Sequence, residues 1–249
     1  MIAGIPWLAW PAALVVGLSL GVLGSGGSIL TVPLLHLLVG LRTPVAVATS
    51  LPIVGIVALV GMAGYARAGD VRWRAVGPFV LTSVPTAFAA HALLFPEIPV
   101  VVQTFSFAAL MLVVAFRMAV TGETPAAGRH PALVLLAAVV VGVLNGCLGV
   151  GGGFVIVPAL VLMLGFEPKA AVATSLLVIA MNCGASLLAD QVGKGATVRW
   201  DLAAVFGAVG AAGALLGGRI ARGLPPVVIR RTFAAVVVVL AVAMIVGAV

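Results

Sequence analysis

Charged residues are scarce in this 249-residue sequence, at 8% of the chain, whereas a soluble globular domain carries about 25%. Eight long runs contain no charged residue other than histidine, namely residues 1–41, 43–66, 75–96, 98–116, 131–166, 170–189, 202–218 and 232–249. Crossing the hydrocarbon core of a membrane takes about 20 apolar residues. A backbone in lipid must also satisfy its own hydrogen bonds. The low charge therefore argues against a soluble domain and predicts an all-α polytopic membrane protein.

Cysteine and acidic residues are also few. Cys147 and Cys183 both lie in apolar runs, so a disulfide framework is not expected. Acidic residues lie at the ends of the apolar runs, as Glu97, Glu123, Glu167, Asp190 and Asp201 do. This placement argues against a carboxylate proton relay or sodium site inside the spans. No cluster of His, Asp and Glu has metal or acid–base spacing, so we expect neither a cofactor nor an enzyme.

The basic residues are more numerous than the acidic ones. Thirteen Lys and Arg against six Asp and Glu give a net charge of +7. They lie in short segments between apolar runs, which is the pattern that orients membrane proteins, so no nucleic-acid partner is predicted. The first run has no basic segment before it and continues into a glycine-rich stretch, so a cleavable signal peptide is not expected.

Glycine, by contrast, is abundant and is arranged as a repeat. Residues 21–34 read GVLGSGGSILTVPL, and residues 146–159 read GCLGVGGGFVIVPA. At an offset of 125, fifteen of the thirty residues from 21 to 50 are identical to residues 146–175, including AVATS at 46–50. Val-Arg-Trp at 71–73 recurs at 198–200. We therefore predict two homologous halves, residues 1–122 and 131–249, joined by a linker over residues 123–130 into one membrane domain.

The two runs that contain the glycine phrase are too long for one crossing. Residues 131–166 would form about 54 Å of helix across a core of about 30 Å. Each run could cross once with an unwound centre, or fold back at the glycines as a re-entrant hairpin. Single crossings divide the Lys and Arg seven to six between the two sides, whereas hairpins divide them ten to three. The second division is a cytoplasmic bias, so the sequence favours hairpins.

The hairpin interpretation fixes a topology. Each half then has a hairpin plus three transmembrane helices, and an odd number of crossings makes the two halves inverted relative to each other. Both termini are predicted outside the cytoplasm, on the periplasmic side. Residues 67–74 and 219–231 are predicted on the cytoplasmic side.

A helix begins again after each glycine cluster, and its first amides have no intrahelical partner. Glycine leaves such amides uncovered, and a helix N-terminus favours an anion. We predict that a small anion binds at both clusters, with the repeated Thr-Ser pairs in the same cavity. The candidate residues are Ser25, Gly26, Gly27, Ser28, Thr49, Ser50, Asn145, Gly151, Gly152, Gly153, Thr174 and Ser175.

Other interpretations of these residues remain open. Small residues also let membrane helices pack closely, so the glycines could serve helix packing in an assembly protein, or bind a lipid phosphate in a membrane enzyme. His36 and His91 lie in apolar runs and could carry a coupling proton, because histidine titrates near neutrality; a structural role is the alternative. Asn182 is expected to hydrogen-bond between helices.

The pattern GxGGxxxxxP…G…AVATS, present twice, resembles the sulfite exporter TauE/SafE family of membrane permeases over essentially the whole chain. The resemblance implies export of a small sulfur-containing anion, sulfite or an organosulfonate, across the bacterial inner membrane. The inverted halves predict that transport proceeds by alternating access around a midplane site at the two glycine-rich helix breaks. The residues that carry the pattern are Gly24, Gly26, Gly27, Pro33, Thr49, Ser50, Gly149, Gly151, Gly152, Gly153, Pro158, Thr174 and Ser175. Ser28 stands where the second half has Gly153, so the half-sites need not be equivalent. The oligomeric state does not follow from the sequence.

Overall fold

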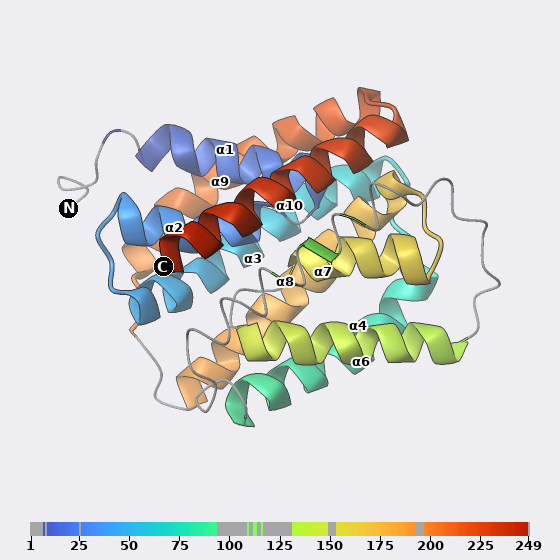
Figure 1. Ribbon diagram of the computed structural model, residues 1–249, viewed down its shortest axis with the longest axis horizontal. Coiled ribbons are helices and arrows are strands. Elements are labelled where there is room, and N and C mark those ends of the chain that lie inside the picture. The colour runs from blue at the N-terminus through green and yellow to red at the C-terminus, as the bar shows by residue number, and fades with distance from the viewer. Residues whose placement is uncertain are drawn as a thin grey trace.

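The computed structural model describes residues 7, 9–24, 26–93, 109, 112–113, 116, 131–148, 153–192 and 197–248. All regular structure in these residues is helical (Figure 1). The elements are α1 (Ala9–Leu23), α2 (Gly26–Leu37), α3 (Thr43–Arg67), α4 (Trp73–Leu93), α6 (Pro131–Leu148), α7 (Gly153–Pro158), the π-helix η2 (Ala159–Met163), α8 (Pro168–Val192), α9 (Trp200–Gly223) and α10 (Pro226–Ala248). The linker, and nearly all of the third span predicted for the first half, lie outside the described residues.

Three of the described helices are long and apolar enough to cross a membrane, over Pro44–Arg67, Pro168–Gln191 and Trp200–Gly223. Shorter apolar helices cover Ala9–Leu23, Val76–Ala90 and Val134–Leu144. Large apolar side chains stay exposed along the helices, and Leu81 and Leu188 are more than 60% exposed. Such surface is costly in water and is suited to acyl chains. The prediction of a helical multi-pass membrane protein is therefore confirmed.

The helix boundaries follow local chemistry. Proline, whose missing N–H costs nothing in the first turn, is the first residue of α6, α8 and α10. Gly69, with φ 79°, follows the end of α3. Two further glycines end equivalent helices: Gly40 follows α2 with φ 74°, and Gly165 follows η2 with φ 62°.

The same hydrogen bond closes both of these glycine turns. The N–H of Leu41 donates to the carbonyl of Leu35 at 3.1 Å, and the N–H of Phe166 donates to the carbonyl of Leu160 at 3.0 Å. Each hydrogen bond has a sequence separation of six residues, one more than the long bond of a Schellman C-cap. The four residues correspond in pairs at the repeat offset of 125. The two halves therefore share local structure as well as sequence.

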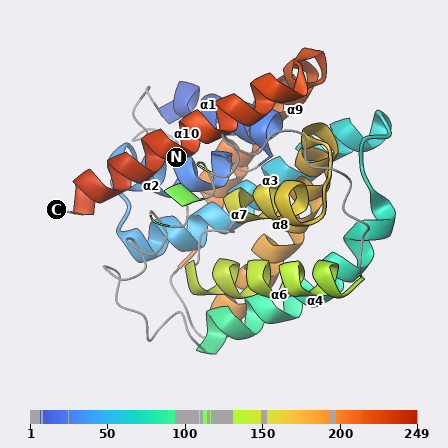
Figure 2. The same cartoon turned by 45° about the vertical axis from the view of Figure 1, so that its right-hand side comes forward.

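Helices α3 and α8 pack against each other in the centre of the molecule, and two helix pairs flank them (Figures 1 and 2). On one side α9 packs along both α1 and α3; on the other, α4 packs along both α6 and α8. These two sets of contacts involve helices that correspond in the sequence repeat, since α1 corresponds to α6 and α4 to α9.

Glycine allows the flanking helices to approach backbone to backbone. A Cβ atom built on Gly17 or Gly21 of α1 would strike the carbonyl of Gly210 or Ala214 of α9. On the other side, a Cβ on Gly142 of α6 would lie 2.6 Å from the carbonyl oxygen of Ser83 of α4. Gly17 and Gly142 correspond at the repeat offset. Close packing by small residues, left open as an alternative above, is therefore the role of these particular glycines.

The first long run folds back on itself. Gly24, with φ 72°, ends α1, and its N–H donates to the carbonyl of Leu20 at 2.8 Å. A Cβ on Gly27 of α2 would lie 2.5 Å from the carbonyl oxygen of Val16 and 2.8 Å from Cβ of Leu20. Helix α2 therefore returns along α1. In the second half, α7 and η2 contact α6, and the residues that join α6 to α7 lie outside the described part.

Candidate functional site

The two repeated Thr-Ser pairs are buried on the central helices. Thr49 and Ser50 lie near the start of α3, and Thr174 and Ser175 near the start of α8, all with at most 2% of their surface exposed. Polar groups at such positions need hydrogen-bond partners, because no water replaces them. Each serine hydroxyl donates to the carbonyl three residues earlier, Val47 for Ser50 at 2.7 Å and Val172 for Ser175 at 2.8 Å.

The two threonines bond across the halves in a crossed arrangement. The N–H of Arg199 donates to Oγ1 of Thr49 at 3.1 Å, and the N–H of Arg72 donates to Oγ1 of Thr174 at 3.4 Å. Arg72 directly precedes α4 and Arg199 directly precedes α9, so each threonine caps an amide at the start of a helix of the other half. The contacts also require α3 and α8 to run in opposite directions.

The structure does not bring the two Thr-Ser pairs together. Thr49 lies at one end of the α3–α8 pair, and Thr174 lies at the other end, beside the segment that follows α3. The length of α3 from Thr49 to Tyr65 alone rises about 24 Å. The expectation of one cavity lined by both pairs does not fit this arrangement. Because α3 and α8 are antiparallel, equivalent residues near their starts lie at opposite ends of the pair.

The structure does bring the first glycine cluster to the Thr-Ser pair of the other half. The hydroxyl of Ser175 lies 3.2 Å from the carbonyl oxygen of Gly24, to which it can donate. A Cβ on Gly24 would lie 2.7 Å from Oγ of Ser175 and 2.9 Å from Cα of Val172. A turn of the first half is thus seated on the N-terminal part of α8.

Helices restart after both clusters, at Gly26 for α2 and Gly153 for α7, and these two helices contact each other. Gly27 is buried against α1, which is the packing interpretation of that residue. Four of the predicted site residues lie in helices, but their side-chain surroundings are not described: Gly26, Ser28, Asn145 and Gly153. Ser25, Gly151 and Gly152 lie outside the described residues.

His36 and His91 are the two candidates for a coupling proton. His36 is exposed at the end of α2, and its Nδ1 lies 2.7 Å from the carbonyl oxygen of Leu41, to which it donates. This hydrogen bond holds the side chain of His36 against the glycine turn after α2, which is a structural role. His91 lies in α4, and its side chain is among those not described.

Asn182 is the most notable polar residue of the interior. It is fully buried in α8, and the hydroxyl of Ser83 on α4 donates to its Oδ1 at 3.4 Å. The predicted interhelical hydrogen bond is therefore present. Its Nδ2 has no hydrogen-bond partner among the described residues, although an unsatisfied buried donor costs about 1–3 kcal/mol. The sequence contained a signal for this donor, a polar residue within an apolar run, but contained none for Ser83 as its partner.

The comparisons with known proteins identify the family. Residues 9–244 match the model of the sulfite exporter TauE/SafE family. The chain belongs to this family. A probable membrane transporter protein of Xylella fastidiosa strain Temecula1 is 31% identical over 244 residues, which cover 91% of this TauE/SafE chain and 90% of the relative. Another, from Methanocaldococcus jannaschii, is 29% identical over 187 residues, 70% of each chain. No solved structure is significantly similar to the chain.

The match confirms the family resemblance drawn from the duplicated motif. This TauE/SafE chain is therefore a membrane transporter and not an enzyme.

Proposed function

We propose that this TauE/SafE transporter exports a small sulfur-containing anion, sulfite or an organosulfonate, across the bacterial inner membrane. Support for the substrate class and the direction comes from the description of the family as sulfite exporters. Support for an anion comes independently from the residues. The clusters provide backbone N–H groups at helix starts, which attract negative charge, and hydroxyl groups lie beside them.

The transport mechanism is alternating access by two inverted halves, residues 1–122 and 131–249. The observation that carries it is the crossed pair of hydrogen bonds, Thr49 to Arg199 and Thr174 to Arg72. An axis in the membrane plane generates reciprocal contacts of this kind at opposite faces. The equivalent glycine contacts on the flanking helices and the equivalent C-caps at Gly40 and Gly165 are further support.

Each crossed hydrogen bond closes one face of the transporter. Opening toward one side separates the start of one flanking helix from the central pair and breaks one bond, while the other bond stays intact. A single hydrogen bond contributes a net of about 1 kcal/mol. The two open forms therefore differ little in free energy from the closed one, as an exchange between conformations requires.

The anion binds at the glycine turns, in two half-sites rather than one cavity. One half-site combines the turn Ser25–Ser28 with the Thr-Ser pair of the second half. The other half-site combines Asn145 and the turn Gly151–Gly153 with the Thr-Ser pair of the first half. The seating of Gly24 on Ser175 supports this pairing for the first turn. The Nδ2 of Asn182, which has no hydrogen-bond partner in the described part of the chain, is a further donor for the anion as it passes between the half-sites. Both termini lie in the periplasm, in line with the ten-to-three division of basic residues.

The test is transport by purified protein in proteoliposomes, with radiolabelled sulfite and a panel of alkylsulfonates. The variants are Thr49→Val and Thr174→Val. The control is Thr82→Val, because the hydroxyl of the half-buried Thr82 donates to the carbonyl of Pro78 in its own helix. We expect saturable sulfite or sulfonate transport by the native protein. Each crossed-bond variant should lose about fivefold of this transport per folded molecule, which is the scale of one hydrogen bond of about 1 kcal/mol. Thr82→Val should lose none.

Two results would contradict the proposal. If no member of the anion panel is transported, the substrate class is wrong. If both valine variants transport as the control does, the crossed hydrogen bonds do not gate transport.

A further inference from the structure

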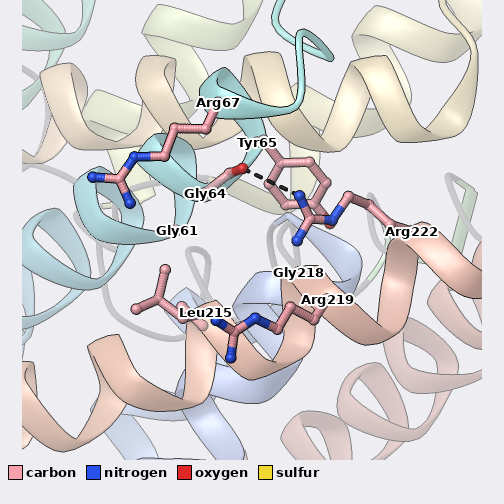
Figure 3. Close-up of a pocket in the computed structure, with 9 residues that line it drawn as sticks. Gly61, Gly64, Tyr65, Arg67, Leu215, Gly218, Arg219 and Arg222 are labelled. Atoms are coloured by element: carbon pink, nitrogen blue, oxygen red, sulfur yellow. Dashed lines mark hydrogen bonds between the residues drawn. The ribbon is translucent and has the colours of Figure 1, made fainter.

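A pocket of about 200 Å³ lies between the C-terminal parts of α3 and α9, away from the Thr-Ser pair of the first half. Figure 3 shows the residues around it. It is lined by Gly61, Gly64, Tyr65, Arg67, Ala214, Leu215, Gly218, Arg219 and Arg222. The lining thus combines three arginines with small and apolar residues. We propose that this pocket binds an anionic phospholipid.

The arginines supply the head-group part of the site. Arg67 comes from α3, and Arg219 and Arg222 come from α9; their exposed side chains extend around the same pocket (Figure 3). Nη1 of Arg222 donates to the carbonyl oxygen of Gly64 at 3.4 Å. Among the described residues, none of the three is ion-paired with a carboxylate, whereas Arg199 at the other face pairs with Asp201. Three like charges around one pocket favour an anion, and guanidinium groups bind phosphate in a bidentate manner.

The glycines supply the acyl-chain part. Gly61, Gly64 and Gly218 place no side chain in the pocket, and a Cβ on Gly64 would already lie 3.4 Å from Cδ2 of Leu215. Leu215, which lines the pocket, is 38% exposed on α9. The pocket is therefore apolar beside its charged rim, and it opens toward the surface that faces acyl chains. A free inorganic anion would use the rim alone, whereas a phospholipid uses both parts.

The position of the pocket also fits an anionic lipid. Arg67, Arg219 and Arg222 all lie on the side that collects ten of the thirteen basic residues. Anionic lipids of the cytoplasmic leaflet attract such segments, at about 1 kcal/mol for each Lys or Arg near the surface. The inference rests on the pocket and the membrane orientation, and it is independent of which anion is transported.

The experiment is lipid titration of the detergent-solubilised protein, followed by native mass spectrometry. The probes are dioleoyl phosphatidylglycerol, dioleoyl phosphatidylcholine, glycerol 3-phosphate and sulfate. The test variant is Arg67→Gln with Arg219→Gln; Arg222 is kept because it bonds the backbone of α3. The control, Arg42→Gln with Arg231→Gln, removes the same charge from exposed positions elsewhere. A second variant, Gly64→Leu, places a side chain in the pocket. Its control is Gly77→Leu, where a Cβ meets open space.

We expect phosphatidylglycerol to bind at least tenfold more tightly than phosphatidylcholine. The arginine variant should weaken phosphatidylglycerol binding about 30-fold, the sum expected for two arginines, and Gly64→Leu should weaken it while both controls do not. Equal binding of the two lipids, or an equal loss in the charge control, would overturn the proposal. Sulfate or glycerol 3-phosphate binding as tightly as phosphatidylglycerol, with no effect of Gly64→Leu, would also overturn it and assign the pocket to a free anion.

Discussion

Single residues decide how the first glycine turn is built. Gly24 combines two constraints that glycine alone meets. Its φ of 72° is in the left-handed region, and its missing side chain leaves room for Ser175 and Val172 of the other half. Gly40 has nearly the same φ, 74°, but a Cβ there would meet nothing within 4 Å. A comparison of substitutions at Gly24 and Gly40 therefore separates the cost of the left-handed backbone from the cost of the close contact with the second half.

The first prediction uses this pair. Gly24→Ala and Gly40→Ala both introduce a left-handed alanine, at about 1–2 kcal/mol. Only Gly24→Ala adds a Cβ at 2.7 Å from Oγ of Ser175 and 2.9 Å from Cα of Val172. Thermal unfolding in detergent should show the larger loss of stability for Gly24→Ala, with loss of transport as well. Equal shifts in the two variants would show that the contact with the second half is not what requires glycine at position 24.

The second prediction concerns the unpartnered donor of Asn182. Replacement by leucine removes a buried Nδ2 that has no partner among the described residues, but it also removes the Oδ1 that accepts from Ser83 at 3.4 Å. The two effects oppose each other, so the midpoint of thermal unfolding should change little. Transport in proteoliposomes should fall at least about tenfold if the amide meets the anion. Ser83→Ala, which removes only the hydroxyl that donates to Asn182, should affect transport less. A destabilised Asn182→Leu variant with normal transport would make the amide a structural group.

At the scale of helices, glycine serves two different purposes in this chain. Gly17, Gly21 and Gly142 allow flanking helices to touch backbone to backbone. Gly26 and Gly153 instead begin the helices that restart after the clusters. Packing glycines contribute to the folded state itself, whereas the glycines of the turns are proposed to expose amides to the anion. Substitutions at the two kinds of position should therefore fail in different ways.

The third prediction makes this contrast measurable. Gly17→Val and Gly142→Val force apart α1 and α9, or α6 and α4, so the yield of folded, monodisperse protein should drop sharply. Gly26→Val and Gly151→Val should give folded protein whose transport per molecule is lost. Gly77→Val, on an open helix surface, is the control for the introduction of a β-branched residue. Normal transport by both Gly26→Val and Gly151→Val would remove the glycine turns from the anion site.

The sequence predicts the individual helices and turns better than it predicts which helices pack against each other. Run length and the glycine phrase leave a single broken crossing or a fold-back open for residues 1–41, and the ten-to-three division of the basic residues favours the fold-back. Helix α2 does return along α1. Recurrence singled out Thr49 and Thr174, and both prove to be buried and bonded across the halves. The pairing of α1 with α9 was not predictable, because Gly17 and Gly210 resemble any small residues until the facing helix is known. The expectation of a single shared cavity does not fit the contacts of Thr49 and Thr174, because sequence equivalence does not indicate at which end of an antiparallel helix pair each residue lies.

At the scale of the whole molecule, the crossed contacts make each half part of the other's architecture. Thr49 of the first half caps the start of α9, and Thr174 of the second half caps the start of α4. Neither half could keep these caps alone, so the chain is expected to fold as one unit. The same contacts place the segment after α3 and the segment after α8 at opposite ends of the central pair. Whether the halves are inverted can therefore be tested by asking on which side of the membrane each of these two equivalent segments lies.

The last prediction tests the inversion through these loops. Asp70 precedes α4 and Thr197 precedes α9, and the two positions correspond at an offset of 127, which is that of the repeated Val-Arg-Trp segment. With Cys147 and Cys183 replaced by alanine, Asp70→Cys and Thr197→Cys each provide one reactive thiol. An impermeant maleimide added to intact cells should modify position 197 and not position 70, and inside-out vesicles should give the reverse. Halves of the same orientation would place both loops on one side, because equivalent positions of parallel repeats share a membrane face. Modification of both positions from the same side would therefore exclude inverted halves, and with them the alternation of the two crossed threonine contacts as the basis of transport.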